Sequence, residues 1–293
     1  MNGNDGRRTV RPLIWAVRRE LWENRSVYLA PLAVAAVFLA AFPIGLVRLP
    51  GKINAVSALG PMQQQEAVQQ PYVMVALVLM AVSMVVAVVY SVDALYGERR
   101  DRSILFWKSL PVSDLTTVLS KASIPILVLP LLTFALTVTA HMIMLLAGGA
   151  VLAAAGPGAG TLWRHVPFFE MSVASFAHVV VFHGLWYAPF YGWLLLASAW
   201  ARRMPILWAV LPVVVIAAVE KIAFDTSRFA AALLQRVTGG GGLSASAGPM
   251  TLETMVPEPL GQLVTRPGLW IGLAVTAVFL FGAVRLRRTR API

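Results

Sequence analysis

The stretch YLAPLAVAAVFLAAFPIGLV, residues 28–47, decides the fold class, because its 20 residues include no charged side chain. A helix needs about 20 apolar residues to cross the hydrocarbon core of a bilayer, which is about 30 Å thick. A segment in lipid must also satisfy its own backbone hydrogen bonds, which a helix does. The stretch therefore predicts a transmembrane helix, and with it an all-α membrane protein.

Five further apolar stretches of similar character follow. They cover residues 72–96, 122–147, 172–200, 206–224 and 268–286. The composition agrees, since 58% of the 293 residues are hydrophobic and 13% are charged, against roughly 25% charged in a soluble domain. We therefore predict one membrane domain over residues 1–293, with six transmembrane helices. Pro125 and Pro130 should kink the third helix, and Pro189 and Gly192 should let the fourth bend.

The basic residues predict the orientation. With six spans and both termini in the cytoplasm, 17 of the 24 Lys and Arg residues lie on the cytoplasmic side, as the positive-inside rule requires. We expect a multi-pass protein of a bacterial inner membrane with cytoplasmic N- and C-termini. A net charge of +11 would suggest nucleic acid in a soluble protein. Here the basic residues border apolar spans, so we expect them to contact membrane lipid and no nucleic acid.

Two shorter segments predict amphipathic helices. The first covers residues 9–25 and includes RPLIWAVRRELWE, residues 11–23, whose apolar side chains recur near helical spacing. We expect it to lie in the membrane interface, although a soluble helix packed on a partner has the same pattern. The second is SRFAAALLQRV, Ser227 to Val237, on the outer side before the last span. The Gln-rich segment of residues 62–70 is expected to be a loop.

The most informative segment is LYGERRDRSILFWKSLPVSDLTTVLSK, residues 95–121, between the second and third spans. Its centre, Ile104 to Trp107, consists of four bulky apolar residues flanked by charges, and an exposed patch of this kind usually marks a contact site. Pro111 should end the short helix before it, and Ser113 or Asp114 can cap the next helix. A membrane-surface anchor is the alternative, because Trp and Phe between basic residues also suit the interface.

This segment resembles the corresponding loop of type-2 ABC transporter permeases, in which a charged E-R-x run leaves the second span and an L-P-V-S turn and a Lys follow. In that family the loop forms the coupling helix, which docks on the cytoplasmic ATPase. The resemblance covers Glu98, Arg99, Arg102, Phe106, Trp107, Leu110, Pro111, Ser113 and Lys121. Ile104 and Leu105 complete the expected ATPase-binding surface. Many relatives have a G-T-x-E step where this chain has Asp101 to Leu105, so the resemblance leaves the subfamily open.

Other parts of the chain match that family in layout. The helix of residues 9–25 resembles its elbow helix, and Ser227 to Val237 resembles its external re-entrant helices. The resemblance implies the membrane subunit of an ATP-driven exporter, which forms the translocation path as a dimer with a second copy or a sister permease. The cargo stays open. The runner-up functions are an ion-coupled carrier or membrane-integrated enzyme, and a membrane component for assembly or signalling that transports nothing.

The chain itself has no phosphate-binding loop of the form G-x-x-x-x-G-K-[ST], and the nearest glycine-rich segment, residues 156–161, has no lysine. We therefore expect no enzyme activity and no cofactor in this chain, with ATP and Mg²⁺ bound by the partner ATPase. No metal site is expected either, since the chain has no cysteine and His178 and His183 lie about 140° apart around a helix.

The fourth span and the middle of the third supply a candidate substrate path. Its residues are His141, Trp186, Tyr187 and Tyr191. An ionisable group inside a span usually faces the bundle interior or a water-filled cavity. A hydrogen bond between helices is the alternative role for His141, and packing or an interface belt is the alternative role for the aromatic residues.

Overall fold

The computed structural model describes residues 5–105, 112–156, 158, 160–237 and 265–289. All regular elements in this part of the chain are helices. Six of the helical segments are long and apolar enough to cross a membrane, which confirms the predicted number. They are Ser26–Leu46, Pro61–Arg100, Asp114–Ala155, Phe168–Trp186, Pro205–Phe224 and Pro267–Thr289.

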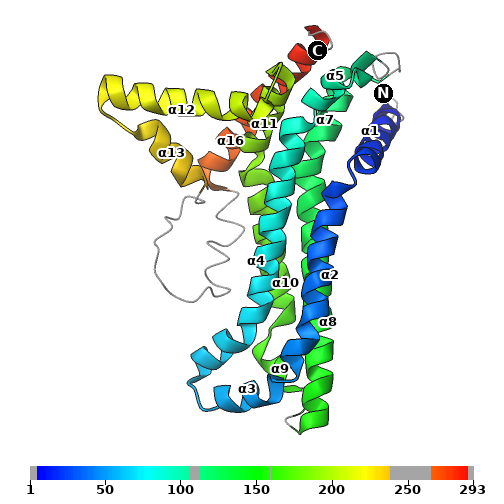
Figure 1. Ribbon diagram of the computed structural model, residues 1–293, viewed down its shortest axis with the longest axis vertical. Coiled ribbons are helices and arrows are strands. Elements are labelled where there is room, and N and C mark those ends of the chain that lie inside the picture. Colours follow the sequence, from blue (N-terminus) through cyan, green and yellow to red (C-terminus); the bar gives the residue numbers. More distant parts are fainter. Residues whose placement is uncertain (1–4, 106–111, 157, 159, 238–264, 290–293) are drawn as a thin grey trace.

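The centre of the fold is a bundle of long helices that run side by side (Figure 1). They are α2 (Ser26–Leu46), α4 (Pro61–Asp93) and α8 (Leu129–Ala155), with α10 (Phe168–Phe176), the π-helix η2 (Ala177–Trp186), α11 (Ala188–Trp200) and α16 (Pro267–Thr289). Helices α5 (Tyr96–Arg100) and α7 (Asp114–Ser123) lie at the end of the bundle where both termini lie, here named the terminal end. At the opposite, distal end are α3 (Leu49–Val56) and α9 (Gly160–His165).

The core between α2, α4 and α8 is apolar, with Leu79, Leu145 and Leu152 fully buried. Polar contacts also cross it, among them a 2.5 Å hydrogen bond between the hydroxyls of Ser83 and Thr133. Helices α11 and α16 pack through small residues, because a Cβ on Gly192 would lie 3.3 Å from Thr276. Close helix contact at small residues is a common way for membrane helices to associate.

The third span changes its helical form near the expected kink. Residues Ile124–Val128 form a π-helical turn, η1, which contains Pro125 and joins α7 to α8. A proline removes one backbone donor, and π turns are a usual way for a helix to absorb such a defect. The fourth span is π-helical over η2 and breaks at Tyr187, just before Pro189. Gly192 serves helix packing and does not mark the break.

The predicted amphipathic helix at the N-terminus is α1 (Asp5–Glu23). It packs on α7 at the terminal end (Figure 1) and buries Ala16 and Glu20, whereas Trp15 and Trp22 are exposed. The guanidinium of Arg18 lies 5.4 Å and 4.7 Å from these two indole rings. This Trp and Arg surface suits a membrane interface, and the placement of α1 in the interface stays a prediction.

Two local predictions need correction at the distal end. Residues 62–70 are not a loop, because α4 already begins at Pro61 and the Gln-rich segment forms its first turns. One reason is tertiary: the amide of Gln69 is buried and donates a 3.0 Å hydrogen bond to the backbone oxygen of His165. The sequence also gave no sign of α3, which connects α2 to α4.

The fifth apolar helix, α12 (Pro205–Phe224), leaves the bundle and runs crosswise to α4 (Figure 1). Extended backbone at Ala201 and a left-handed conformation at Met204 turn the chain between α11 and α12. Only Ala209 of α12 is buried. Helix α13 (Arg228–Val237) then returns toward the bundle, close to the start of α16. The fifth predicted span is therefore present as a helix of the expected length and composition, but it does not run alongside the bundle helices.

Candidate functional site

The segment that enters the loop between the second and third spans is fixed to the end of α11. The hydroxyl of Ser198 accepts hydrogen bonds from the backbone amides of Leu95 and Tyr96, at 3.0 and 2.9 Å. The guanidinium of Arg99 donates to the backbone oxygens of Ser198 and Ala201. Carbonyl groups at the end of a helix lack partners within it and favour a cation. Arg99 is therefore buried as an anchor for the end of α11.

The segment that leaves the same loop is α7. Ser113 is its N-cap and accepts a 3.1 Å hydrogen bond from the backbone amide of Thr116. Ser113 was one of the two caps predicted from the sequence. The other, Asp114, instead directs its carboxylate to Arg287 near the end of α16. The segments that enter and leave the loop are therefore both attached to helices of the bundle.

A buried ion cluster joins these positions. It consists of Arg19 and Glu20 from α1, Glu98 from α5, Asp114 and Lys121 from α7, and Arg287 from α16. Three carboxylates thus face three cations. Glu20 is 0% exposed, and Glu98, Lys121 and Arg287 are also buried. One of its contacts, between Glu98 and Arg287, joins residues that are 189 positions apart in the chain.

Glu98 is at the centre of the ion cluster. One carboxylate oxygen of Glu98 lies 3.1 Å from the Lys121 ammonium and 3.5 Å from the Arg19 guanidinium. The other oxygen lies 3.2 Å from Arg287. Lys121 in turn lies 3.0 Å from Glu20, which also accepts a 2.9 Å hydrogen bond from the Tyr90 hydroxyl. Glu98 therefore contacts residues of three helices, α1, α7 and α16.

The ion cluster affects stability mainly when one of its members is removed. Desolvation of buried charges costs about as much as their mutual attraction returns, so an intact buried pair adds little net stability. Removal of a single member, by contrast, leaves an uncompensated charge in a site of low dielectric constant. Such a cluster holds one arrangement of its helices and penalises others.

The pKa of Glu20 reflects this balance. Burial alone would raise the pKa of this carboxyl, but Lys121, and after it Arg19 and Tyr90, outweigh burial and hold the pKa below the ordinary 4.5. The neighbouring Glu23 moves the other way, because burial raises its pKa more than Arg19 lowers it. Glu20 is therefore the carboxylate of α1 whose charge contributes to the fold.

We expect a pH dependence from Glu20. A carboxyl whose pKa is lower in the folded state contributes stability above its unfolded pKa, and this contribution is lost as pH falls through the folded pKa. The wild-type chain should therefore lose stability in detergent below about pH 4.5, and this part of the loss should be missing from Glu20→Gln. Thermal unfolding across pH measures it. Glu23→Gln is the control and should retain the wild-type decline; an unchanged profile in Glu20→Gln would contradict the assignment.

The predicted ATPase-binding residues divide into three groups. Glu98, Arg99 and Ile104 are buried inside the chain, with Ile104 1% exposed, so they are not part of its exposed surface, and their role in ATPase binding stays a prediction. Adjacent side chains on a helical turn point in different directions, and Leu105 is accordingly 59% exposed. Arg102 is exposed as well, with a left-handed φ of 58°. Phe106, Trp107, Leu110 and Pro111 lie outside the described residues.

Sequence reasoning missed most of the ion cluster. Glu20, Asp114 and Arg287 were not proposed as members of one cluster with Glu98. One signal was available for Glu20, since it lies one helical turn after Ala16 on a face that would otherwise be apolar. No pattern along the chain indicates a contact between Glu98 and Arg287, because these residues meet only through the packing of α16 on α7 and α11.

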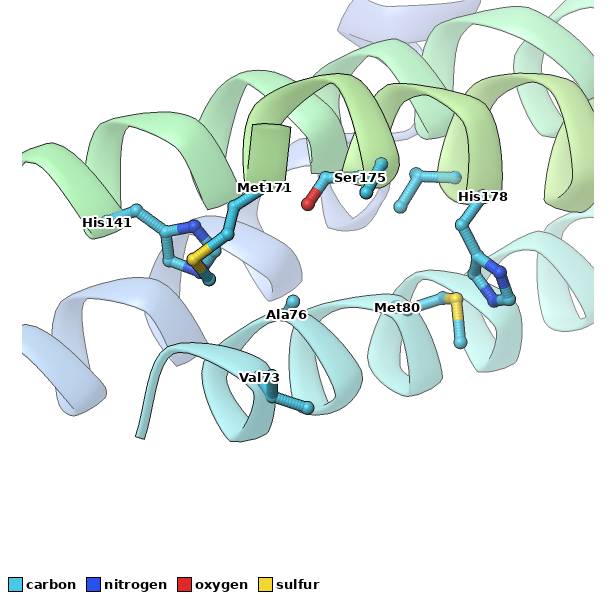
Figure 2. Close-up of a pocket in the computed structure, with 9 residues that line it drawn as sticks. Val73, Ala76, Met80, His141, Met171, Ser175 and His178 are labelled. Atoms are coloured by element: carbon cyan, nitrogen blue, oxygen red, sulfur yellow. The ribbon is translucent and has the colours of Figure 1, made fainter. Parts of the chain in front are cut away.

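The residues of the predicted substrate path do not line one common cavity. His141 lies in a small pocket of about 20 Å³ between α4, α8, α10 and η2 (Figure 2). Its Nε2 donates a 2.9 Å hydrogen bond to the backbone oxygen of Tyr72, which is the helix-contact alternative. The pocket has room for about one water molecule. An organic cargo of ordinary size does not fit there.

The aromatic residues of the predicted path have structural contacts of their own. The Trp186 indole and the Tyr187 hydroxyl donate to the backbone oxygens of Arg236 and Val237, and so attach α13 to η2. The Arg236 guanidinium stacks 4.1 Å from the Trp186 ring. Tyr191 is buried and bonds to His183 at 3.2 Å. Within the described residues, no group of three or more His, Asp and Glu side chains is arranged to hold a metal ion.

No protein-family model, no curated protein and no solved structure matches the chain. The functional argument therefore depends on the fold, the ion cluster and the loop that begins and ends beside it.

Proposed function

We propose that this chain is the membrane subunit of an ATP-driven exporter with the layout of a type-2 ABC permease, and that a separate cytoplasmic ATPase drives it. The observation that carries the proposal is the ion cluster. The loop of residues 102–112 has Glu98 just before it and Asp114 just after it, and both carboxylates belong to the cluster. A force applied to this loop would act on α1, α7 and α16 together.

Rigid transmission is what ATP-driven transport requires of such a loop. Protein interiors respond to small displacements as packed bodies and not as continuously deformable material. The Arg99 anchor adds α11 to the same unit through the carbonyl groups of Ser198 and Ala201. ATP and Mg²⁺ would be bound by the ATPase, since this chain has no phosphate-binding loop.

The proposal includes a second permease chain. Helix α12 is apolar on all sides and projects from the bundle with little of its surface covered. In a dimer, part of this α12 surface would contact the second chain and the rest would contact lipid. ATP-binding cassettes act in pairs in the family that the loop resembles, which also implies two permeases, either two copies or one copy and a sister chain.

Removal of the apolar side chains in the loop tests the proposal. We expect the amount of ATPase subunit that co-purifies with the double variant Phe106→Ala/Trp107→Ala to fall at least about tenfold. Aromatic contacts at the centre of an interface often contribute about 2 kcal/mol or more each. The measurement is co-purification of an ATP-hydrolysing subunit with the tagged chain from native membranes. Trp15→Ala/Trp22→Ala removes two exposed indoles from α1 and should retain the partner.

Three results would contradict the proposal. One is undiminished ATPase association of the Phe106/Trp107 variant. Another is transport by the purified chain with no ATPase present, which would favour an ion-coupled carrier. The third is ATPase binding without any ATP-dependent transport by the reconstituted complex, which would favour an assembly or signalling component.

A further inference from the structure

An apolar cavity lies at the distal end, opposite the ion cluster. Its volume is about 500 Å³, which is within the usual range of ligand sites. Side chains of α2, α3, α4 and α9 line it, and most are apolar, including Phe42, Leu46, Leu49 and Ile53. No carboxylate lines it, and its one charged lining residue is Lys52.

The position of Lys52 relative to the membrane indicates the kind of ligand. Helix α2 ends at Leu46 after 21 residues, about the length needed to cross the hydrocarbon core. Lys52 follows on α3, which runs crosswise at the end of the bundle (Figure 1). The last turns of α2 supply apolar lining and α3 supplies the ammonium. In a bilayer that α2 spans, the ammonium would lie at headgroup depth and part of the cavity wall at acyl-chain depth.

The charge of Lys52 is not neutralised by the described part of the chain. No carboxylate there forms an ion pair with its ammonium. The nearby acid of α4, Glu66, is not among the residues that line the cavity. A basic side chain at the membrane surface attracts an anionic lipid headgroup by about 1 kcal/mol.

We propose that this cavity is a binding site for an anionic membrane phospholipid, with an acyl chain among Phe42, Leu46 and Leu49 and the phosphate at Lys52. The site is independent of the proposed transport function. Gly45 lines the cavity from α2, and a Cβ there would meet no atom within 4 Å. The absence of a side chain at this position leaves open the space that the acyl chain occupies.

Photo-crosslinking of the full chain in phosphatidylcholine vesicles tests the site. The probes are phosphatidylglycerol and phosphatidylcholine with a diazirine in one acyl chain, and peptide mass spectrometry locates the label. We expect phosphatidylglycerol to label residues 42–56 and 67–72, about fivefold more than phosphatidylcholine does, as one basic contact implies. Lys52→Gln should remove this preference, whereas Arg48→Gln, which changes a basic residue outside the lining, should retain it.

A second pair of variants tests the acyl-chain position. Gly45→Trp should fill the cavity and reduce labelling by phosphatidylglycerol several-fold. Ile44→Trp places the same side chain on the adjacent residue, which is 76% exposed and not part of the lining, and should leave labelling unchanged. Equal labelling of the cavity residues by both lipids would overturn the proposal. So would label that is found evenly along α12, or a cavity that a second copy of the chain covers and shields from both lipids.

Discussion

Replacement of Glu98 with Gln should destabilise the chain by roughly 3–5 kcal/mol, the cost of a buried cation without its partner. Glu98 contacts Arg19, Lys121 and Arg287, so its neutralisation leaves the ion cluster with one more positive than negative charge. Denaturant or thermal unfolding in detergent measures the loss. The same variant should also weaken ATP-dependent transport, because α16 and α7 would no longer share the contact with α1.

A double variant separates the ion cluster from simple loss of packing. Lys121→Gln in the Glu98→Gln background restores the charge balance and should recover at least about 1 kcal/mol, within the coupling energies usual for residues in contact. Asp93→Asn is the matched control, since it removes a carboxylate whose partner Arg100 is exposed, and surface pairs contribute little. If Glu98→Gln is as stable as wild type, the cluster does not hold these helices.

The second large effect is expected at Gly184, where the two π-helical segments touch. A Cβ at Gly184 would lie 2.5 Å from the backbone oxygen of Ile126 in η1, a distance that requires the backbone to move. Gly184→Val should therefore cost roughly 3 kcal/mol, the upper end of the usual range for overpacking. Unfolding in detergent measures this cost, and intact transport would show that the contact between η1 and η2 can open.

Gly45→Ala provides the comparison for Gly184. Both glycines lie in transmembrane helices, but a Cβ on Gly45 would meet no atom within 4 Å. Alanine also favours a helix over glycine by about 1 kcal/mol. Gly45→Ala should thus be neutral or slightly stabilising. A loss at Gly45→Ala as large as the loss at Gly184→Val would contradict the assignment of the Gly184 effect to the close approach to Ile126.

The long apolar segments could be predicted from the sequence because lipid imposes a simple requirement on each of them separately. Length and the absence of charge were sufficient for α2, α4, α8 and α16, and the positions of Pro125 and Ser113 indicated a helical defect and a cap. These features depend on neighbours within a few residues. The local sequence was therefore enough to predict these spans, the helical defect and the cap.

The direction of α12 could not be predicted in this way. Its composition is that of a span, and the turn at Met204 has no strong sequence signal, since methionine has no preference for the left-handed conformation found there. The exposure of the loop was misjudged for a related reason. Ile104 and Leu105 are equally apolar, and only the packing of the folded chain buries the first and exposes the second.

The ion cluster depends on contacts between distant segments, and this is why sequence reasoning identified Glu98 and Lys121 as notable but did not pair them. Each basic residue near the end of a span has an ordinary explanation in the positive-inside rule. The acids Glu20, Glu98 and Asp114 are the more informative residues, because the rule gives no reason to bury them.

The absence of cysteine allows a direct test of rigid transmission. Spin labels at Trp15→Cys on α1 and Leu105→Cys beside the loop, both exposed positions, report the distance within one chain by pulsed electron resonance in the complex with its ATPase. We predict that this distance stays within about 2 Å between the nucleotide-free and ATP-bound states, while the distance between the Leu105 labels of paired copies changes. A shift of α1 relative to Leu105, with paired copies fixed, would contradict transmission through the ion cluster.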